Sequence, residues 1–181
     1  MDKIINLGIP HVGEQIFASL DTENLIYCLD VSQTWRVLAE RIFIKRKDSF
    51  FKACKLGNLK ILKLLLEHYN DEEDRLNTTD NNGWTPLMWA SLKRRNHIVH
   101  FLLNHSDLKI DLDAEDNNDD TAFSLACLRG YEDIIKLFLE KEKEEGDQTQ
   151  TLVTKKEELE RKLRRKGKWE AFMNLRRFKI K

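Results

Sequence analysis

The sequence predicts an all-α protein in which a three-helix N-terminal unit packs onto a short helical solenoid that ends in a charged C-terminal helix. Three observations support this class: a segment that recurs three times, apolar residues at helical spacing, and a basic tail. We expect residues 1–47 to form the N-terminal unit, 48–143 the repeats, and 144–181 a linker and a basic capping helix.

The charge of the chain is balanced overall but uneven along its length. Lys plus Arg and Asp plus Glu both total 31, so net charge favours neither a nucleic acid nor a membrane as partner. From Lys155 onward the net charge is +8, which leaves −8 on the rest of the chain. The chain thus has a basic C-terminal tail behind a mildly acidic body.

Cysteine usage and hydropathy indicate an intracellular chain. Cys28, Cys54 and Cys127 are few, scattered and without a C-x-x-C pair, so neither a disulfide scaffold nor a thiolate metal site is predicted. The N-terminus lacks the pattern of a signal peptide, and no stretch approaches the roughly 18 apolar residues of a membrane span. We expect the cytoplasm, with the nucleus as the alternative.

Three segments align without gaps, beginning at Asp48, Thr85 and Thr121, with spacings of 37 and 36 residues. Each first residue can accept a hydrogen bond from an unpaired amide of a helix's first turn, and Pro86 suits the first helical position. Small pairs and then apolar pairs recur in register along each segment. The repeats are predicted at about 48–79, 80–115 and 116–143.

The loops that precede the second and third segments also match. Asp80-Asn-Asn-Gly83 and Asp116-Asn-Asn-Asp119 both have a residue that tolerates positive φ in their fourth position. Arg94 stands where the other two segments have a helix-ending glycine.

The run from Asp80 to Leu87, D-x-x-G-x-T-P-L, resembles the ankyrin repeat. The resemblance implies a stack of helix pairs that binds another protein through its turn tips and first helices. Trp84 and Trp89 are the best candidate anchors, or else they pack between repeats. The predicted target-binding residues are Asn81, Asn82, Trp84, Trp89, Asn117, Asn118 and Asp120.

The N-terminal segment has the apolar spacing of three short helices. Ile16, Phe17 and Leu20 mark the first, Asp21 can cap the second, and the third is predicted to start near Ser32. A unit this small is marginal alone and needs a neighbour or a partner.

This segment resembles the F-box. The resemblance rests on Ile9-Pro10, on the apolar residues of the first helix, and above all on Val31-Ser-Gln-Thr-Trp35-Arg36. It implies docking to a Skp-type adaptor of a cullin–RING ubiquitin ligase. The predicted adaptor-binding residues are Ile9, Pro10, Ile16, Phe17, Leu20, Leu25, Val31 and Trp35. The alternative is that these helices only cap the repeat stack.

The C-terminal segment reads as a polar cap for the last repeat. Thr154-Lys-Lys-Glu157 has the form of a capping box, Gly167 interrupts the helix, and Trp169, Phe172 and Met173 give a second short apolar face. The basic run 161–168 could instead be an import signal or a patch for an acidic partner; nucleic-acid binding is not favoured.

No catalytic motif is present, so the chain is not predicted to be an enzyme, and no cofactor or metal is expected. The sequence therefore predicts a substrate-recruiting subunit of an SCF-type ubiquitin ligase, with a Skp-type adaptor and an unknown target protein as partners. The alternative is an ankyrin scaffold or inhibitor without a ligase link.

Overall fold

The computed structural model describes residues 10–46, 48–68, 75–105, 108–144 and 150–177. The chain divides into two compact units, Met1–Ala53 with Asn58–Asn70 and Cys54–Gly57 with Asp71–Lys181. Every regular element in the described ranges is an α-helix, which confirms the predicted all-α class. No helix among those residues is long and apolar enough to cross a membrane.

The first unit begins with three short helices, α2 (Pro10–Ser19), α3 (Thr22–Cys28) and α4 (Gln33–Lys45). The predicted cap at Asp21 is confirmed, since it accepts the Asn24 amide at 2.6 Å. Ser32, near which the third helix was predicted to start, caps α4 by accepting the Trp35 amide at 3.3 Å. Both caps satisfy first-turn amides that have no partner inside the helix. The helices α3 and α4 therefore begin at residues whose side chains can cap them.

The same unit contains α6 (Leu59–His68) and the start of α5 (Ser49–Leu56), and α4 packs against both α2 and α6. The Arg46 guanidinium donates to the carbonyls of Ala18 and Leu20, and the buried Ser49 hydroxyl donates to the Phe43 carbonyl at 2.5 Å. These bonds tie the end of α2 to the turn between α4 and α5.

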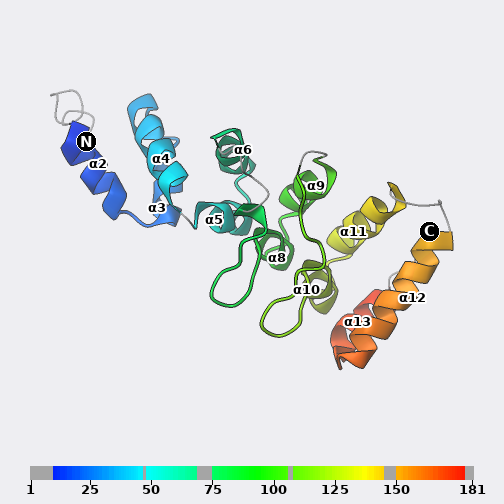
Figure 1. Cartoon of the computed structure of the whole chain (residues 1–181). Coiled ribbons are helices and arrows are strands. Elements are labelled where there is room, and N and C mark those ends of the chain that lie inside the picture. The colour runs from blue at the N-terminus through cyan, green and yellow to red at the C-terminus, as the bar shows by residue number, and fades with distance from the viewer. Residues whose placement is uncertain (1–9, 47, 69–74, 106–107, 145–149, 178–181) are drawn as a thin grey trace. The chain divides into compact units, whose positions relative to one another are not determined.

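The second unit contains two helix pairs, α8 (Pro86–Leu92) with α9 (Asn96–Asn104) and α10 (Ala122–Arg129) with α11 (Glu132–Glu144). First helices pack on each other, α8 on α10, and so do second helices, α9 on α11, as Figure 1 shows. The second helices supply a continuous core of buried apolar side chains: Ile98, Val99, Leu102, Leu103, Ile134, Ile135, Phe138 and Leu139.

The ends of these helices follow the predicted chemistry. Thr85 and Thr121 cap α8 and α10, accepting the amides of Met88 at 3.2 Å and Ser124 at 3.1 Å. Gly130 ends α10 with φ of 65°, whereas α8 is followed by Arg94 at φ of 54°. The arginine therefore adopts a left-handed conformation that suits glycine.

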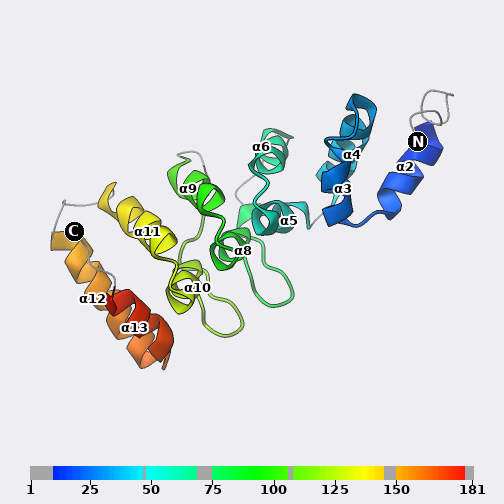
Figure 2. The same ribbon diagram turned by 180° about the vertical axis from the view of Figure 1, so that it is seen from behind.

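The C-terminal segment is a pair of helices, α12 (Gln150–Arg165) and α13 (Trp169–Arg177), rather than one capping helix. Gly167 separates them with φ of 69°, as predicted, but α12 begins before Thr154, so a capping box there is wrong. The helix after the break, α13, packs on α10, while α12 packs on α11 (Figures 1 and 2). The chain order of this pair is thus reversed relative to a repeat.

Candidate functional site

Two aspartates organise the loops that precede α8 and α10. Asp80 Oδ1 accepts the amides of Asn82 at 2.8 Å and Trp84 at 3.0 Å. Its equivalent, Asp116, accepts through Oδ1 the amides of Asn118 and Asp120, each at 2.8 Å. A carboxylate that accepts two or more backbone amides holds a loop in one conformation, because each charge-assisted bond fixes one peptide plane.

The second oxygen of each aspartate binds a tryptophan. Trp89 Nε1 donates to Asp80 Oδ2 at 2.9 Å within one repeat, and Trp84 Nε1 donates to Asp116 Oδ2 of the next repeat at 2.7 Å. The two indoles meet edge to face with ring centroids 4.7 Å apart, and Lys55 Nζ lies 5.1 Å from the centroid of the Trp89 ring. Both indoles are half-buried; Trp84 joins its loop to the loop of the next repeat, whereas Trp89 is bound to the loop of its own repeat.

The loop tips carry exposed asparagines. The backbone amide of Asn117 donates to the carbonyl of Asn82 at 3.1 Å, and its side chain donates to the carbonyl of Asn81 at 3.2 Å. Adjacent tips are therefore joined, while Asn81, Asn82, Asn117 and Asn118 remain exposed to solvent. Rigid, exposed amides beside half-buried aromatic rings can bind a partner's backbone and side chains without paying much ordering entropy.

Asp120 does not belong with these exposed residues. It is only 7% exposed, and its carboxylate accepts the Ser124 hydroxyl at 2.9 Å and Lys168 Nζ at 2.7 Å. The Asp120 carboxylate is therefore occupied in this conformation, and its contact with a target stays a prediction. Asp120 instead joins the third repeat to the C-terminal pair, just as Trp84, at the equivalent position, joins the second repeat to the third.

The lysines of the basic tail bind the same loop. Lys166 Nζ donates to Glu115 Oε1 at 2.6 Å and to the carbonyl of Asp119 at 3.2 Å, and Lys162 Nζ lies 3.4 Å from Glu115 Oε1. The hydrogen bond from Lys166 is the main reason why the pKa of Glu115 is lowered. Sequence reasoning missed this cluster, because its members lie about fifty residues apart and nothing in their spacing connects them.

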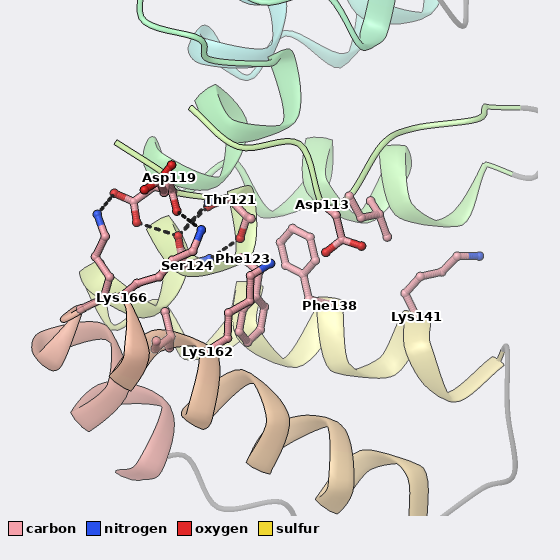
Figure 3. Close-up of a pocket in the computed structure, with 13 residues that line it drawn as sticks. Asp113, Asp119, Thr121, Phe123, Ser124, Phe138, Lys141, Lys162 and Lys166 are labelled. Carbon is pink, nitrogen blue, oxygen red and sulfur yellow. Dashed lines mark hydrogen bonds and ion pairs between the residues drawn. The ribbon is translucent and has the colours of Figure 1, made fainter. Parts of the chain in front are cut away.

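These lysines line a cavity of about 190 Å³ beside the third repeat, shown in Figure 3. Phe123 and Phe138, with ring centroids 5.7 Å apart, form its apolar wall. The hydroxyls of Thr121 and Ser124 also line it, but both take part in capping α10. The polar groups of this cavity are therefore largely engaged in structural contacts. This differs from a catalytic site, where a nucleophile is hydrogen-bonded to a base.

The buried thiols are equally unsuited to covalent chemistry. Burial raises the pKa of Cys54 and of Cys127, so both stay protonated at neutral pH. They fill equivalent close-packed positions in α5 and α10. The described residues contain no group of three side chains that could hold a metal ion.

The predicted adaptor-binding residues fall into three groups. Phe17 and Leu25 are fully buried in the core of the first unit, where Phe17 meets Trp35 edge to face at 5.2 Å between centroids. Neither side chain is accessible to an adaptor in this conformation, so adaptor contact by these two residues stays a prediction. Ile16, Leu20 and Trp35 are half-buried and Val31 is 57% exposed; Ile9 and the side chain of Pro10 lie outside the described residues.

Comparison with known proteins agrees with the repeat geometry. The family model of ankyrin repeats, with three copies, matches residues 50–151. The mouse ankyrin repeat family A protein 2 is 39% identical over 63 residues, which cover 35% of this chain and 19% of that protein. The putative ankyrin repeat protein YahD of Escherichia coli K12 is 35% identical over 92 residues, 48% of this chain and 43% of that protein. The chain thus spans less than half the length of either relative.

Proposed function

This chain belongs to the ankyrin-repeat family, and from that premise we propose that it recruits a target protein to an SCF-type ubiquitin ligase without catalysing any step itself. Ankyrin repeats imply protein partners. In the proposal the loop tips bind the target and the unit α2–α4 docks a Skp-type adaptor. This role places the protein in the cytoplasm, with the nucleus as the alternative.

The observation that supports target binding is the joined pair of loop tips. Four exposed asparagines are held in place by the Asp80 and Asp116 networks and by the indoles of Trp84 and Trp89. A preorganised polar surface with partly exposed aromatic rings is the composition that binding interfaces favour. We assign the target contact to Asn81, Asn82, Asn117, Asn118, Trp84 and Trp89.

The observation that supports adaptor docking is apolar exposure on a very small helical unit. Tyr27 is 75% exposed, Val31 57% and Val37 46%. The Trp35 indole N–H is buried with no acceptor among the described residues. A partner that covers this surface would complete a core that three short helices cannot complete alone.

One observation favours the alternative, a scaffold or inhibitor without a ligase link. Since α4 packs on α6, the N-terminal helices already cover the second helix of the first repeat. Capping alone is a sufficient reason for such a contact. Adaptor binding by the purified full chain distinguishes the two functions.

The test is a binding measurement with a purified Skp-type adaptor by calorimetry. Wild type is expected to bind, and Val31→Asp to bind at least about tenfold more weakly, as for a central apolar contact. Met173→Asp, an equally drastic change at an exposed apolar side chain of α13, serves as the matched control. Wild type without affinity, or Val31→Asp with unchanged affinity, would leave only the scaffold function.

Proximity labelling in cells separates the two surfaces. A variant with Asn81→Arg and Asn118→Arg is expected to lose a target protein and keep the ligase subunits, whereas Val31→Asp should do the reverse. Both asparagines are exposed, so the fold should tolerate the changes. Loss of the same proteins from both variants would contradict a division of labour between the surfaces.

A further inference from the structure

The last helix, α13, has one face turned toward the third repeat. Ala171 and Leu175 are 1% and 0% exposed, and Asn174 Nδ2 donates to the carbonyl of Cys127 in α10 at 2.8 Å. Since α13 packs on α10, these residues define its inner side. Residues at the remaining helical positions must point away from the repeats.

The opposite face carries aromatic and apolar side chains. Trp169 and Met173 are 56% and 44% exposed, and the half-buried Phe172 lies beside them, about one turn after Trp169. The rings of Trp169 and Phe172 meet edge to face with centroids 5.9 Å apart. A terminal element of a repeat stack needs a polar outer face for solubility, so capping does not explain these residues. Contiguous apolar exposure indicates a binding surface.

Arginines border this apolar face. A groove of about 360 Å³ between α12 and α13 is lined by Arg161, Arg164, Arg176 and Phe172, together with Glu157 and Glu160. The Arg176 guanidinium lies 6.0 Å from the centroid of the Phe172 ring. Glu160 is paired with Lys156 at 3.8 Å, which leaves the local balance positive.

The basic tail is therefore divided by residue type. Lys162, Lys166 and Lys168 reach the acidic loop of the third repeat, whereas Arg161, Arg164 and Arg176 line the outer groove. Guanidinium groups bind carboxylates through two parallel hydrogen bonds and stack on aromatic rings, which ammonium groups do less well. The outer groove thus has the side chains for carboxylates next to apolar anchors.

We propose that this face, defined by Trp169, Phe172, Met173, Arg161, Arg164 and Arg176, is a second docking surface that binds an acidic amphipathic helix of a partner protein. The arginines of the groove would bind carboxylates of the partner. Trp169, Phe172 and Met173 would contact apolar side chains that lie one helical turn apart on the partner helix. This surface includes neither the loop tips nor α2–α4, so the proposal does not depend on the proposed ligase function.

The same features count against a nucleic acid. Stacking bases need open ring faces, but Trp169 and Phe172 meet edge to face and Arg176 lies over Phe172. Three lysines of the tail, Lys162, Lys166 and Lys168, are paired with carboxylates of the third repeat and so are not available to phosphates. The nine residues of α13 span about 13.5 Å, which suits two to three turns of a helix.

The test uses the full chain and a fluorescein-labelled peptide probe of about 14 residues, roughly four helical turns. In the probe, leucines occupy one helical face and glutamates the other. Binding is measured by fluorescence anisotropy against three controls: a scrambled peptide of the same composition, the peptide with lysine in place of glutamate, and a single-stranded RNA of equal length. The amphipathic acidic peptide is expected to bind and the other three to bind at least about tenfold more weakly.

Variants locate the contact. Trp169→Ala should weaken peptide binding at least about tenfold, as expected of an aromatic anchor, and Arg164→Glu with Arg176→Glu should weaken it comparably. Val37→Ala and Lys93→Glu, at an exposed apolar and an exposed basic residue elsewhere in the chain, are the controls. Circular dichroism checks that each variant stays folded.

The proposal would be overturned by no binding of the acidic peptide, by equal binding of the peptide to wild type and Trp169→Ala, or by tighter binding of the RNA. Equal binding of the scrambled peptide would reduce the surface to a non-specific charge effect and would also overturn it.

Discussion

Two non-glycine residues, Arg94 and Asp119, hold positive φ angles of 54° and 58°. Both stand at positions where another repeat has glycine. The repeats therefore share the left-handed backbone conformation there, although arginine and aspartate adopt it at a higher energetic cost than glycine. A left-handed backbone costs an L-residue about 1–2 kcal/mol, less for aspartate because its side chain can bond locally. These positions are small reservoirs of strain.

Asp119→Gly should therefore raise the free energy of unfolding by about 0.5–1 kcal/mol. The reciprocal change, Gly83→Asp, should lower it by about 1–2 kcal/mol. At Gly83 a Cβ would lie 3.0 Å from the backbone nitrogen of Asn117, so the aspartate would also crowd the next loop. Urea denaturation followed by tryptophan fluorescence measures both. If Asp119→Gly and Gly83→Asp both changed the free energy of unfolding only slightly, the left-handed backbone would not be strained at these positions.

The lowered pKa of Glu115 gives a prediction for acid pH. The hydrogen bond from Lys166 holds this pKa below its ordinary value of 4.5 in the folded chain, so the unfolded chain takes up the proton first as the pH falls. The contribution is present above pH 4.5 and is lost as the pH falls through the folded pKa. It is small, because Glu115 is well exposed to solvent.

Carbon-13 titration of the Glu115 carboxyl measures this directly. Wild type should titrate below 4.5, and Lys166→Met should return the pKa toward 4.5. Lys162→Met should have a smaller effect, because its contribution ranks below that of Lys166. A wild-type pKa at or above 4.5 would show that the lysine does not hold the carboxylate in solution.

At the scale of elements, the loop before α10 depends on one carboxylate. Asp116 accepts the amides of Asn118 and Asp120 and the indole N–H of Trp84, and it is only 6% exposed. Asp116→Ala should lower the free energy of unfolding by about 3 kcal/mol, because it leaves three donors without their acceptor. The exposed Asn118→Ala is the control and should change it by less than about 0.5 kcal/mol. Comparable losses in the two urea titrations would rule out this role for Asp116.

The orientation of α13 makes a second prediction at this scale. Leu175 is fully buried, so Leu175→Ala should lower the free energy of unfolding by about 2–4 kcal/mol. Trp169→Ala removes a larger side chain but an exposed one, and should lower it by less than about 1 kcal/mol. Differential scanning calorimetry ranks the two. If Trp169→Ala were the more destabilising, the aromatic face would be the inner one and the proposed docking surface would be lost.

At the scale of the whole molecule, the repeats are few and depend on what flanks them. The C-terminal pair contributes the buried side chains of Leu163, Ala171 and Leu175 to the second unit. Its lysines neutralise Glu115 and Asp120 at the end of the third repeat. Repeat stacks lose stability and solubility when a terminal element is removed, since each unit is stabilised by its neighbours.

Removal of residues 150–181 should therefore lower the free energy of unfolding by at least about 2 kcal/mol and promote aggregation. Urea titration and size-exclusion chromatography measure the two effects. A chain shortened only after Arg177 is the control. Unchanged stability of the longer truncation would show that α12 and α13 are an appendage and not part of the packed unit.

The sequence by itself determined the elements whose signals are local. The capping residues Asp21, Ser32, Thr85 and Thr121 and the glycine break at Gly167 depend on side-chain and backbone chemistry within a few residues, and all five are where the pattern predicts them. The repeat register also followed from local spacing, and with it the ankyrin family.

Only the tertiary structure decided which residues are exposed and which charges meet. Phe17, Leu25 and Asp120 were predicted to bind partners and are buried. Trp84 joins adjacent loops, and Trp89 is bound to the loop of its own repeat. Lys166 reaches Glu115 across about fifty residues of chain. The reversed order of α12 and α13 belongs to the same group, because it depends on which apolar face finds α10 and not on any motif. Local chemistry fixes where a helix begins, whereas packing between distant segments fixes what it presents to a partner.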